Sequence, residues 1–442
     1  MTSAKERKNS GNGGGVESLS ALLAASPTPF HATANLAKIL EDAGFAELAE
    51  TNAWKCAPGT KHYVIRGGSS IVAFVAGNSS AAKSGFRIAG AHTDSPCLKV
   101  KPNADVLSAG YHKIGVEPYG GMLLSTWFDR DLSLAGKVVY RTSKGVAAKL
   151  IDFERPIAVV PNLAIHLQRE VNEGRAINRQ TELPPILAQV VDGRAMPFDE
   201  ILLARLNEEG AKDAEAVLAH ELSFYDTQKP AVVGFRGEFL ASARLDNLLS
   251  CWAIIHALAR STGNAWRMVV CNDHEEVGSV SRTGAAGTFL RDVLVRLAGD
   301  SESMFRAVAH SLFFSCDNAH GIHPNYPEKH EPKHTPLLNG GPALKVNFNQ
   351  RYGTEAETAA AVDVLAKEAN VPLQRFVARS DMGCGSTIGP ITAAELGIRT
   401  IDLGVPTFAM HSIRELAGVG DGPALLRLVA TFFSRSAIPL PA

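Results

Sequence analysis

Strand-like segments alternate with helix-patterned segments through the second half of this chain, and this alternation limits its possible folds more than any other feature. From about Gly234 onward, the apolar strand-like runs are 268–271, 311–315, 374–378 and 398–403, and the helical runs are 247–260, 287–298, 355–369 and 425–434. Such alternation favours a sheet with helices on both faces. The pattern therefore predicts an α/β fold.

The first 97 residues also contain helix-patterned and apolar strand-like segments, but the segment after them has a different pattern. Helical spacing over 18–45 is followed by strand-like runs at 61–77 and 86–91. After Pro96 come short strand candidates and a charged stretch (138–140, 158–160, 163–167 and 168–182), then helical candidates at 198–209 and 214–223. We therefore predict one discontinuous α/β domain, 1–97 and 234–442, that is split by a β-rich insertion at 98–233.

Composition excludes several classes of partner. Lys plus Arg (44) nearly balances Asp plus Glu (45), for a net charge of -1, so there is no basic surplus to bind nucleic acid. No apolar run approaches the roughly 18 residues of a membrane span. The polar, Gly-rich residues 1–15 lack the apolar core of a signal peptide and are expected to form a loose tail.

The cysteines indicate the cellular compartment and the kind of metal ligand. The six cysteines are far apart, and no two of them form a C-x-x-C pair. This spacing argues against a disulfide framework or a cysteine-rich zinc site and predicts a reducing cytoplasm. Any metal would then be bound by histidines and carboxylates.

The fragment Asp-His-Glu-Glu-Val-Gly-Ser at 273–279 is the strongest chemical signal. Adjacent glutamates are common on solvated helices, but here a strand-like run at 267–272 precedes them and a turn follows. Carboxylates at the end of a buried strand are costly unless a positive group lies opposite them. Glu275 could then hold a proton while Glu276 binds a metal, as metal-assisted hydrolysis requires.

Four further motifs carry candidate ligands. His92 ends a strand, and Asp94 could orient its ring from behind. Asp246 precedes a helix and could also be an N-cap. Asp317 and His411 follow apolar strands in segments that could also be ordinary polar loops.

Most of these motifs lie at the carboxyl ends of strands, where open α/β sheets place their ligand crevice. Three carboxylates (Asp246, Glu276 and Asp317) and two neutral imidazoles (His92 and His411) bring three negative charges. Two divalent cations with a bridging hydroxide match that charge, whereas one cation leaves a buried surplus. We therefore predict two metal ions, with Asp246 as the bridge.

Several long motifs in order along the chain resemble the aspartyl aminopeptidase family of dinuclear metallopeptidases. The resemblance covers the chain from about Leu19 to the C-terminus. The motifs are AHTDSPCLKVKP, GGMLLSTWFDRDLSLAGKV, NLAIHLQRE, ARLDN, HEEVGS, SCDNAHGIHPNYPEKH, LKVNFNQRY, DMGCGSTIGP and MHSIRE.

The resemblance implies a zinc-peptidase α/β fold with an inserted dimerisation domain, assembled into a tetrahedral dodecamer. By match to the family's motifs, His92 and Asp317 bind one metal, Glu276 and His411 bind the other, and Asp246 bridges them. The metals are expected to be zinc, with manganese or cobalt as alternatives.

Four other positions also match family roles. Glu275 matches the general base, and Asp94 matches the carboxylate that orients His92. His166 matches a residue that enters the active site of a neighbouring subunit, and Lys345 lies near the side-chain pocket.

Two positions depart from the family pattern. His274 stands where Asn is expected, and Gly383 stands where Pro is usual. We expect hydrolysis of N-terminal residues, preferably Asp or Glu, from peptides. The alternatives are an aminopeptidase of broader specificity and a non-catalytic assembly or cargo protein.

Overall fold

The computed structural model describes residues 13–191 and 193–440. They divide into two compact units, which are described separately. The first contains the chain up to Asp94, Pro230–Met410 and the chain from Glu415 onward, and the second contains Ser95–Lys229 with His411–Arg414.

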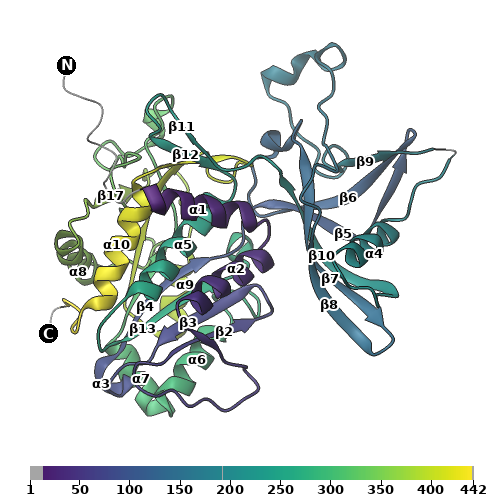
Figure 1. The fold of residues 1–442 in the computed structure, drawn as a ribbon. Coiled ribbons are helices and arrows are strands. Elements are labelled where there is room, and N and C mark those ends of the chain that lie inside the picture. The colour runs from purple at the N-terminus through teal and green to yellow at the C-terminus, as the bar shows by residue number, and fades with distance from the viewer. Residues whose placement is uncertain (1–12, 192, 441–442) are drawn as a thin grey trace, which may run out of the picture. The chain divides into compact units, whose positions relative to one another are not determined.

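A nine-stranded mixed sheet is the centre of the first unit (Figure 1). In spatial order its strands are β1 (Ala46–Glu47), β2 (Lys61–Arg66), β3 (Ser70–Val75), β13 (Trp266–Asn272), β4 (Phe86–His92), β14 (Leu312–Cys316), β18 (Thr400–Gly404), β16 (Ala343–Val346) and β17 (Gln374–Val377). The central strands β13, β4, β14 and β18 run parallel. This arrangement confirms the predicted α/β class.

Helices cover both faces of this sheet, because its central strands are apolar on both sides. On one face lie α1 (Gly13–Ala25), α2 (Pro29–Asp42), α5 (Leu245–Arg260), α8 (Ala356–Glu368) and α10 (Asp421–Ser434). On the other lie α3 (Ala81–Ser84), α6 (Phe289–Ala298), α7 (Ser301–Ala309) and α9 (Ile388–Leu396). Every residue of β4 and β13 is buried, as a strand covered on both faces should be.

A smaller five-stranded sheet completes the first unit. Its order is β11 (Ala231–Val233), β12 (Phe239–Ser242), β20 (Glu415–Gly418), β19 (Pro406–Phe408) and β15 (Ala319–His320). Strand β15 comes directly after β14 in the chain, and β19 comes directly after β18. The smaller sheet is therefore formed partly by segments that follow the carboxyl ends of two central strands of the large sheet.

The second unit is a six-stranded antiparallel sheet. Its order is β8 (Gly145–Asp152), β7 (Leu132–Thr142), β10 (Ala216–Asp226), β5 (Cys97–Ser108), β6 (Tyr111–Tyr119) and β9 (Ile186–Gln189). Helix α4 (Phe198–Glu208) packs onto its apolar core through Phe198, Leu202 and Leu206.

Three local predictions were wrong. The segment 214–223, rich in helix-forming Ala, Leu and Glu, is not a helix: from Ala216 onward it belongs to strand β10, because pairing with β7 overrides helix propensity. Residues 163–167 end in a 3-10 helix, Ile165–Leu167, and not in a strand. Residues 13–15 of the predicted loose tail begin α1, and residues 1–12 of that tail lie outside the described part of the chain.

Within the described ranges, no helix combines the length and the apolar character that a membrane crossing would require.

The buried carboxylate of Asp421 is expected to make the stability of the folded protein depend on pH. It accepts backbone N–H groups from Asn339 at 2.6 Å and from Gly341 at 2.8 Å. Burial raises the pKa of Asp421 to about 6, although these two bonds lower it. The native state therefore keeps a proton that the unfolded state releases from about pH 4 upward, so stability falls as the pH rises through this window.

We expect wild type to lose about 1 kcal/mol of unfolding free energy relative to Asp421→Asn between pH 5 and pH 7. Denaturant unfolding of both proteins at several pH values measures the difference. If the unfolding free energies of the two proteins changed equally with pH, Asp421 would not have a raised pKa in the native state.

Candidate metal centre

The central parallel strands bring three of the candidate motifs to one edge of the large sheet. Strands β4 and β13 pair in register, with Asn272 opposite His92. Strand β14, which precedes Asp317, is the other neighbour of β4. The segments after these strands therefore leave the sheet side by side, at the carboxyl ends of the strands.

His92 is the centre of the resulting cluster. Its ring is 1% exposed, and its Nε2 lies 3.4 Å from Asp246 Oδ1, 3.6 Å from Asp317 Oδ1 and 4.0 Å from Glu275 Oε2. Three carboxylates from three parts of the chain thus surround one ring nitrogen.

Asp94 lies behind this ring and holds the glutamate pair in place. Its Oδ1 lies 3.3 Å from His92 Nδ1. Its two carboxylate oxygens accept the backbone N–H groups of Glu275 and Glu276, each at 3.1 Å. One carboxylate therefore orients both the histidine and the loop that carries the two glutamates.

Asp246 enters the cluster from the first turn of α5 and is 3% exposed. Its backbone N–H donates to Glu415 Oε2 at 2.9 Å. On the same helix, the Cys251 thiol donates to the His92 carbonyl at 3.0 Å. Neither Glu415 nor Cys251 was singled out from the sequence, because no short motif marks a residue that acts only by supporting a neighbour.

Burial and crowding shift the ionisation of these groups. Burial, together with the charges of Asp317 and Asp246, raises the pKa of Glu275 to about 8, although His92 opposes the shift. Burial likewise raises the pKa of Glu276 well above its ordinary value, and Asp246 adds to the effect. Burial alone would lower the pKa of His92, but its contacts with Asp246, Asp317 and Asp94 raise it well above the usual range. So many acidic groups in a buried site favour a cation among them.

The donor set fits a divalent metal. One ligand atom each from His92, Asp246 and Glu276 lies within 4.8 Å of the others, and no second group of this kind occurs in the part of the chain that the structure describes. Imidazole nitrogen and carboxylate oxygens are ligands that zinc accepts. Asp317, which also lies near His92 Nε2, is available as a further ligand.

Lys345 lies beside the cluster and is 2% exposed. Its Nζ is 3.5 Å from Asp317 Oδ2, donates to the Asn318 carbonyl at 3.1 Å and lies 5.0 Å from the centre of the Tyr352 ring. A buried cation is thus held next to a candidate metal ligand.

The other two predicted site residues belong to the second unit. His411 Nδ1 lies 3.1 Å from the Gly121 carbonyl oxygen. His166 is exposed within the 3-10 helix Ile165–Leu167. Their roles as metal ligand and substrate contact remain predictions.

The unusual His274 lies in a local hydroxyl network. Its backbone is left-handed, with a φ of 63°. Its Nδ1 lies 2.8 Å from Ser281 Oγ and 3.2 Å from Thr283 Oγ1. The His274 ring thus stabilises the turn that follows the glutamate pair, through contacts with the hydroxyl groups of Ser281 and Thr283.

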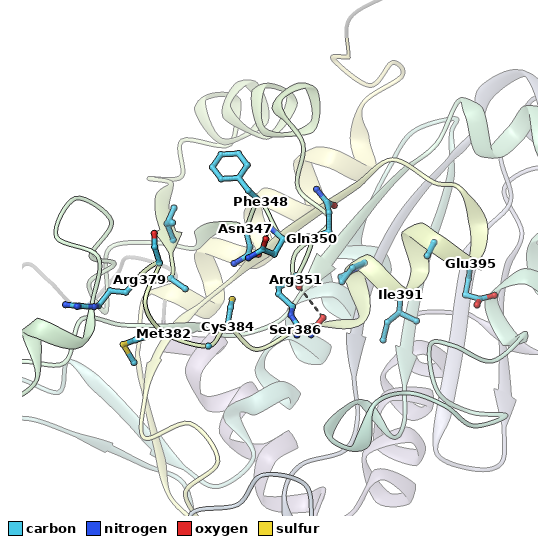
Figure 2. Close-up of a pocket in the computed structure, with 17 residues that line it drawn as sticks. Asn347, Phe348, Gln350, Arg351, Arg379, Met382, Cys384, Ser386, Ile391 and Glu395 are labelled. Atoms are coloured by element: carbon cyan, nitrogen blue, oxygen red, sulfur yellow. Dashed lines mark hydrogen bonds between the residues drawn. The ribbon is translucent and has the colours of Figure 1, made fainter.

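Two cavities share a loop of the first unit, residues 377–384. The smaller, of about 300 Å³, is lined in part by Tyr352, His320 and Met410. The larger, of about 910 Å³, is shown in Figure 2. Gly383, the second departure from the family pattern, lines both.

Asp402 joins the segments that border these cavities. It is fully buried, and its carboxylate accepts the Gly353 N–H and the Thr387 hydroxyl, each at 2.6 Å. These residues directly follow Tyr352 and Ser386, which line the cavities. The sequence marked Asp402 only as part of a strand.

Comparisons with known proteins agree with this arrangement. The profile of the family described as "Aminopeptidase I zinc metalloprotease (M18)" matches residues 22–433. A protein named "Probable M18 family aminopeptidase 2" from Pseudomonas aeruginosa (strain UCBPP-PA14) is 54% identical over 94% of this chain and 97% of its own length.

Solved structures show the same similarity. "Cryo-EM structure of the Ape4 and Nbr1 complex" contains a chain that is 37% identical, with a TM-score of 0.92, over 96% of this chain and 86% of that one. "Structure of S. cerevesiae mApe1 dodecamer" contains a chain that is 28% identical, with a TM-score of 0.82, over 95% of this chain and 96% of that one.

Proposed function

The chain belongs to the Aminopeptidase I zinc metalloprotease (M18) family and is thus an aminopeptidase, and we propose that it acts preferentially on peptides that begin with Asp or Glu. The observation that carries the hydrolytic part is the convergence of His92, Asp246, Glu276 and Asp317 beside Glu275. The observation that supports the acidic preference is the buried cation Lys345 at the edge of this cluster.

We propose two zinc ions held by five residues. His92 and Asp317 are assigned to one ion, Glu276 and His411 to the other, and Asp246 to both. Zinc supplies a lowered pKa for a bound water and polarises the scissile carbonyl.

The protein's own groups move the protons. Glu275 takes the proton of the attacking water and delivers it to the leaving amine, as a general base and then a general acid. Asp94 keeps the Glu275 backbone and the His92 ring in position.

Lys345 offers the charge that an acidic substrate side chain requires. A carboxylate beside a buried ammonium gains a charge-assisted hydrogen bond, which is stronger than a neutral one. In the structure this ammonium contacts Asp317 and the Asn318 carbonyl. We propose that the substrate carboxylate shares this contact. Gly383 borders the adjacent cavity and allows a more open loop than Pro would, so a broader specificity is the second candidate.

The proposed oligomeric state rests on family membership and on the sequence resemblance. We propose a homododecamer built from dimers, in which residues 98–233 form the dimerisation domain and His166 serves the active site of a neighbouring subunit. A relative from S. cerevesiae is described as a dodecamer. All six cysteines are free thiols, which supports a reducing cytoplasm as the proposed location.

A substrate panel tests the acidic preference. We expect kcat/KM for N-terminal Asp and Glu chromogenic substrates to exceed that for Leu and Lys by about tenfold or more, because only the acidic side chains pair with Lys345. A strong chelator should abolish every activity in the panel, and added zinc should restore it. Comparable rates for Leu would favour the broader aminopeptidase, and activity that survives metal removal would contradict the metal mechanism.

A further inference from the structure

One arginine side chain that lines the larger cavity has no role in the proposed catalysis and makes no ion pair with a described residue that would stabilise the fold. Three charged residues line this cavity: Arg351, Arg379 and Glu395. Arg379 makes a two-point ion pair with Asp381 at 2.8 and 2.6 Å, and Glu395 pairs with Arg291 at 2.5 Å. Among the described residues, Arg351 has no ion-pair partner, and its side chain is exposed in the cavity (Figure 2).

The larger cavity shares lining residues with the smaller one, which lies closer to the candidate metal centre. Residues 377–379 and 382–384 line both the larger and the smaller cavity. The smaller one is also lined by Tyr352, whose ring lies 5.0 Å from Lys345 Nζ, and Lys345 in turn contacts Asp317. The two cavities thus border the same loop, and contacts through Tyr352 and Lys345 link the smaller cavity to Asp317.

The remaining lining of the larger cavity suits an extended peptide. Asn347, Asn349 and Gln350 contribute amide groups, which can both donate to and accept from peptide backbone. Phe348, 94% exposed, offers an apolar surface at the same place. Figure 2 shows Asn347, Gln350 and Arg351 close together, with Met382 and Cys384 on the neighbouring loop.

We propose that the larger cavity binds the part of a peptide substrate that follows the cleaved residue, and that Arg351 binds an acidic side chain there. This inference rests on the proposed aminopeptidase function. It assigns a second, downstream determinant of specificity, separate from the contact between Lys345 and the N-terminal side chain. The favoured substrates are then peptides with a carboxylate after the cleaved residue as well as on it.

The test uses amide-capped tetrapeptides that share the N-terminal residue preferred in the substrate panel. A single Glu or Lys is placed at position 2, 3 or 4 with Ala elsewhere, and release of the first residue is followed by mass spectrometry. In wild type we expect the Glu peptide to exceed the Lys peptide in kcat/KM by about fivefold at one of these positions, because a partly solvated ion pair gives a modest gain. Because each comparison is a ratio within one protein, a general change in activity cancels.

Arg351→Glu is expected to invert this ratio, and Arg351→Ala to bring it close to one. The matched control is Arg306→Glu, which changes an exposed arginine of α7 that lines neither cavity and should keep the wild-type ratio. A ratio near one at all positions in wild type, or an unchanged ratio in Arg351→Glu, would overturn this inference and leave the proposed function standing. If wild type releases no N-terminal residue from any peptide, the proposed function itself fails.

Discussion

Replacing Glu275 with Gln is expected to lower kcat by about a thousandfold or more and to leave the zinc content unchanged. Gln matches Glu in size but cannot take a proton from water at neutral pH. The backbone N–H groups of residues 275 and 276 still donate to Asp94, so the loop keeps its position. Glu275 Oε2, 4.0 Å from His92 Nε2, lies at the edge of the cluster and outside its closest donor group.

Steady-state kinetics on the preferred substrate and elemental analysis of the same preparation measure both outcomes. The neighbouring variant Glu276→Gln serves as the contrast, because it changes a proposed ligand and should lower metal content along with activity. Full activity in Glu275→Gln would remove this residue from the mechanism. Loss of metal in that variant would instead make it a ligand.

Replacing Asp246 with Ala is expected to remove bound zinc and activity together. Asp246 belongs to the one group of close donors in the described chain, and its Oδ1 lies 3.4 Å from His92 Nε2. As the proposed bridge it would serve both ions, so its loss should weaken both sites at once. The backbone N–H that donates to Glu415 remains, so the start of α5 should keep its place.

Metal content by elemental analysis, together with circular dichroism to confirm folding, separates loss of metal from loss of structure. Asp363→Ala is a suitable control, since this half-buried carboxylate of α8 pairs only with Arg375 among the described residues. Asp246→Asn, which keeps the shape but not the charge, should bind zinc more weakly than wild type. An Asp246→Ala protein that retains two ions would show that the bridge is assigned wrongly.

Much of the large sheet could be predicted because its strands have a strong local pattern. The apolar runs that become β13, β14 and β18 are flanked by helical segments and bounded by polar motifs. The antiparallel sheet of the second unit was harder to predict, as residues 214–223 show. Their local sequence favours a helix, and only pairing with β7, which is distant along the chain, makes residues 216–223 part of a strand.

The candidate ligands could be predicted because several polar motifs directly follow apolar strands, and the carboxyl ends of such strands are where open α/β sheets place their ligand crevice. His92, Glu276 and Asp317 were identified this way, and the structure brings His92 together with Asp246, Glu276 and Asp317. Their supporting residues could not be found. Glu415, Cys251 and Asp402 contact segments that are distant along the chain, so no local pattern marks them.

The sequence by itself determined the α/β class and the kinds of atoms available to a metal, because hydrophobic periodicity and residue type are local properties. Only the tertiary structure decided the burial of Lys345 against Asp317, the raised pKa values of the glutamate pair and the exposure of Arg351 in a cavity. These depend on distances and solvent exclusion between segments that are remote in sequence, and electrostatic energy is set by those two quantities.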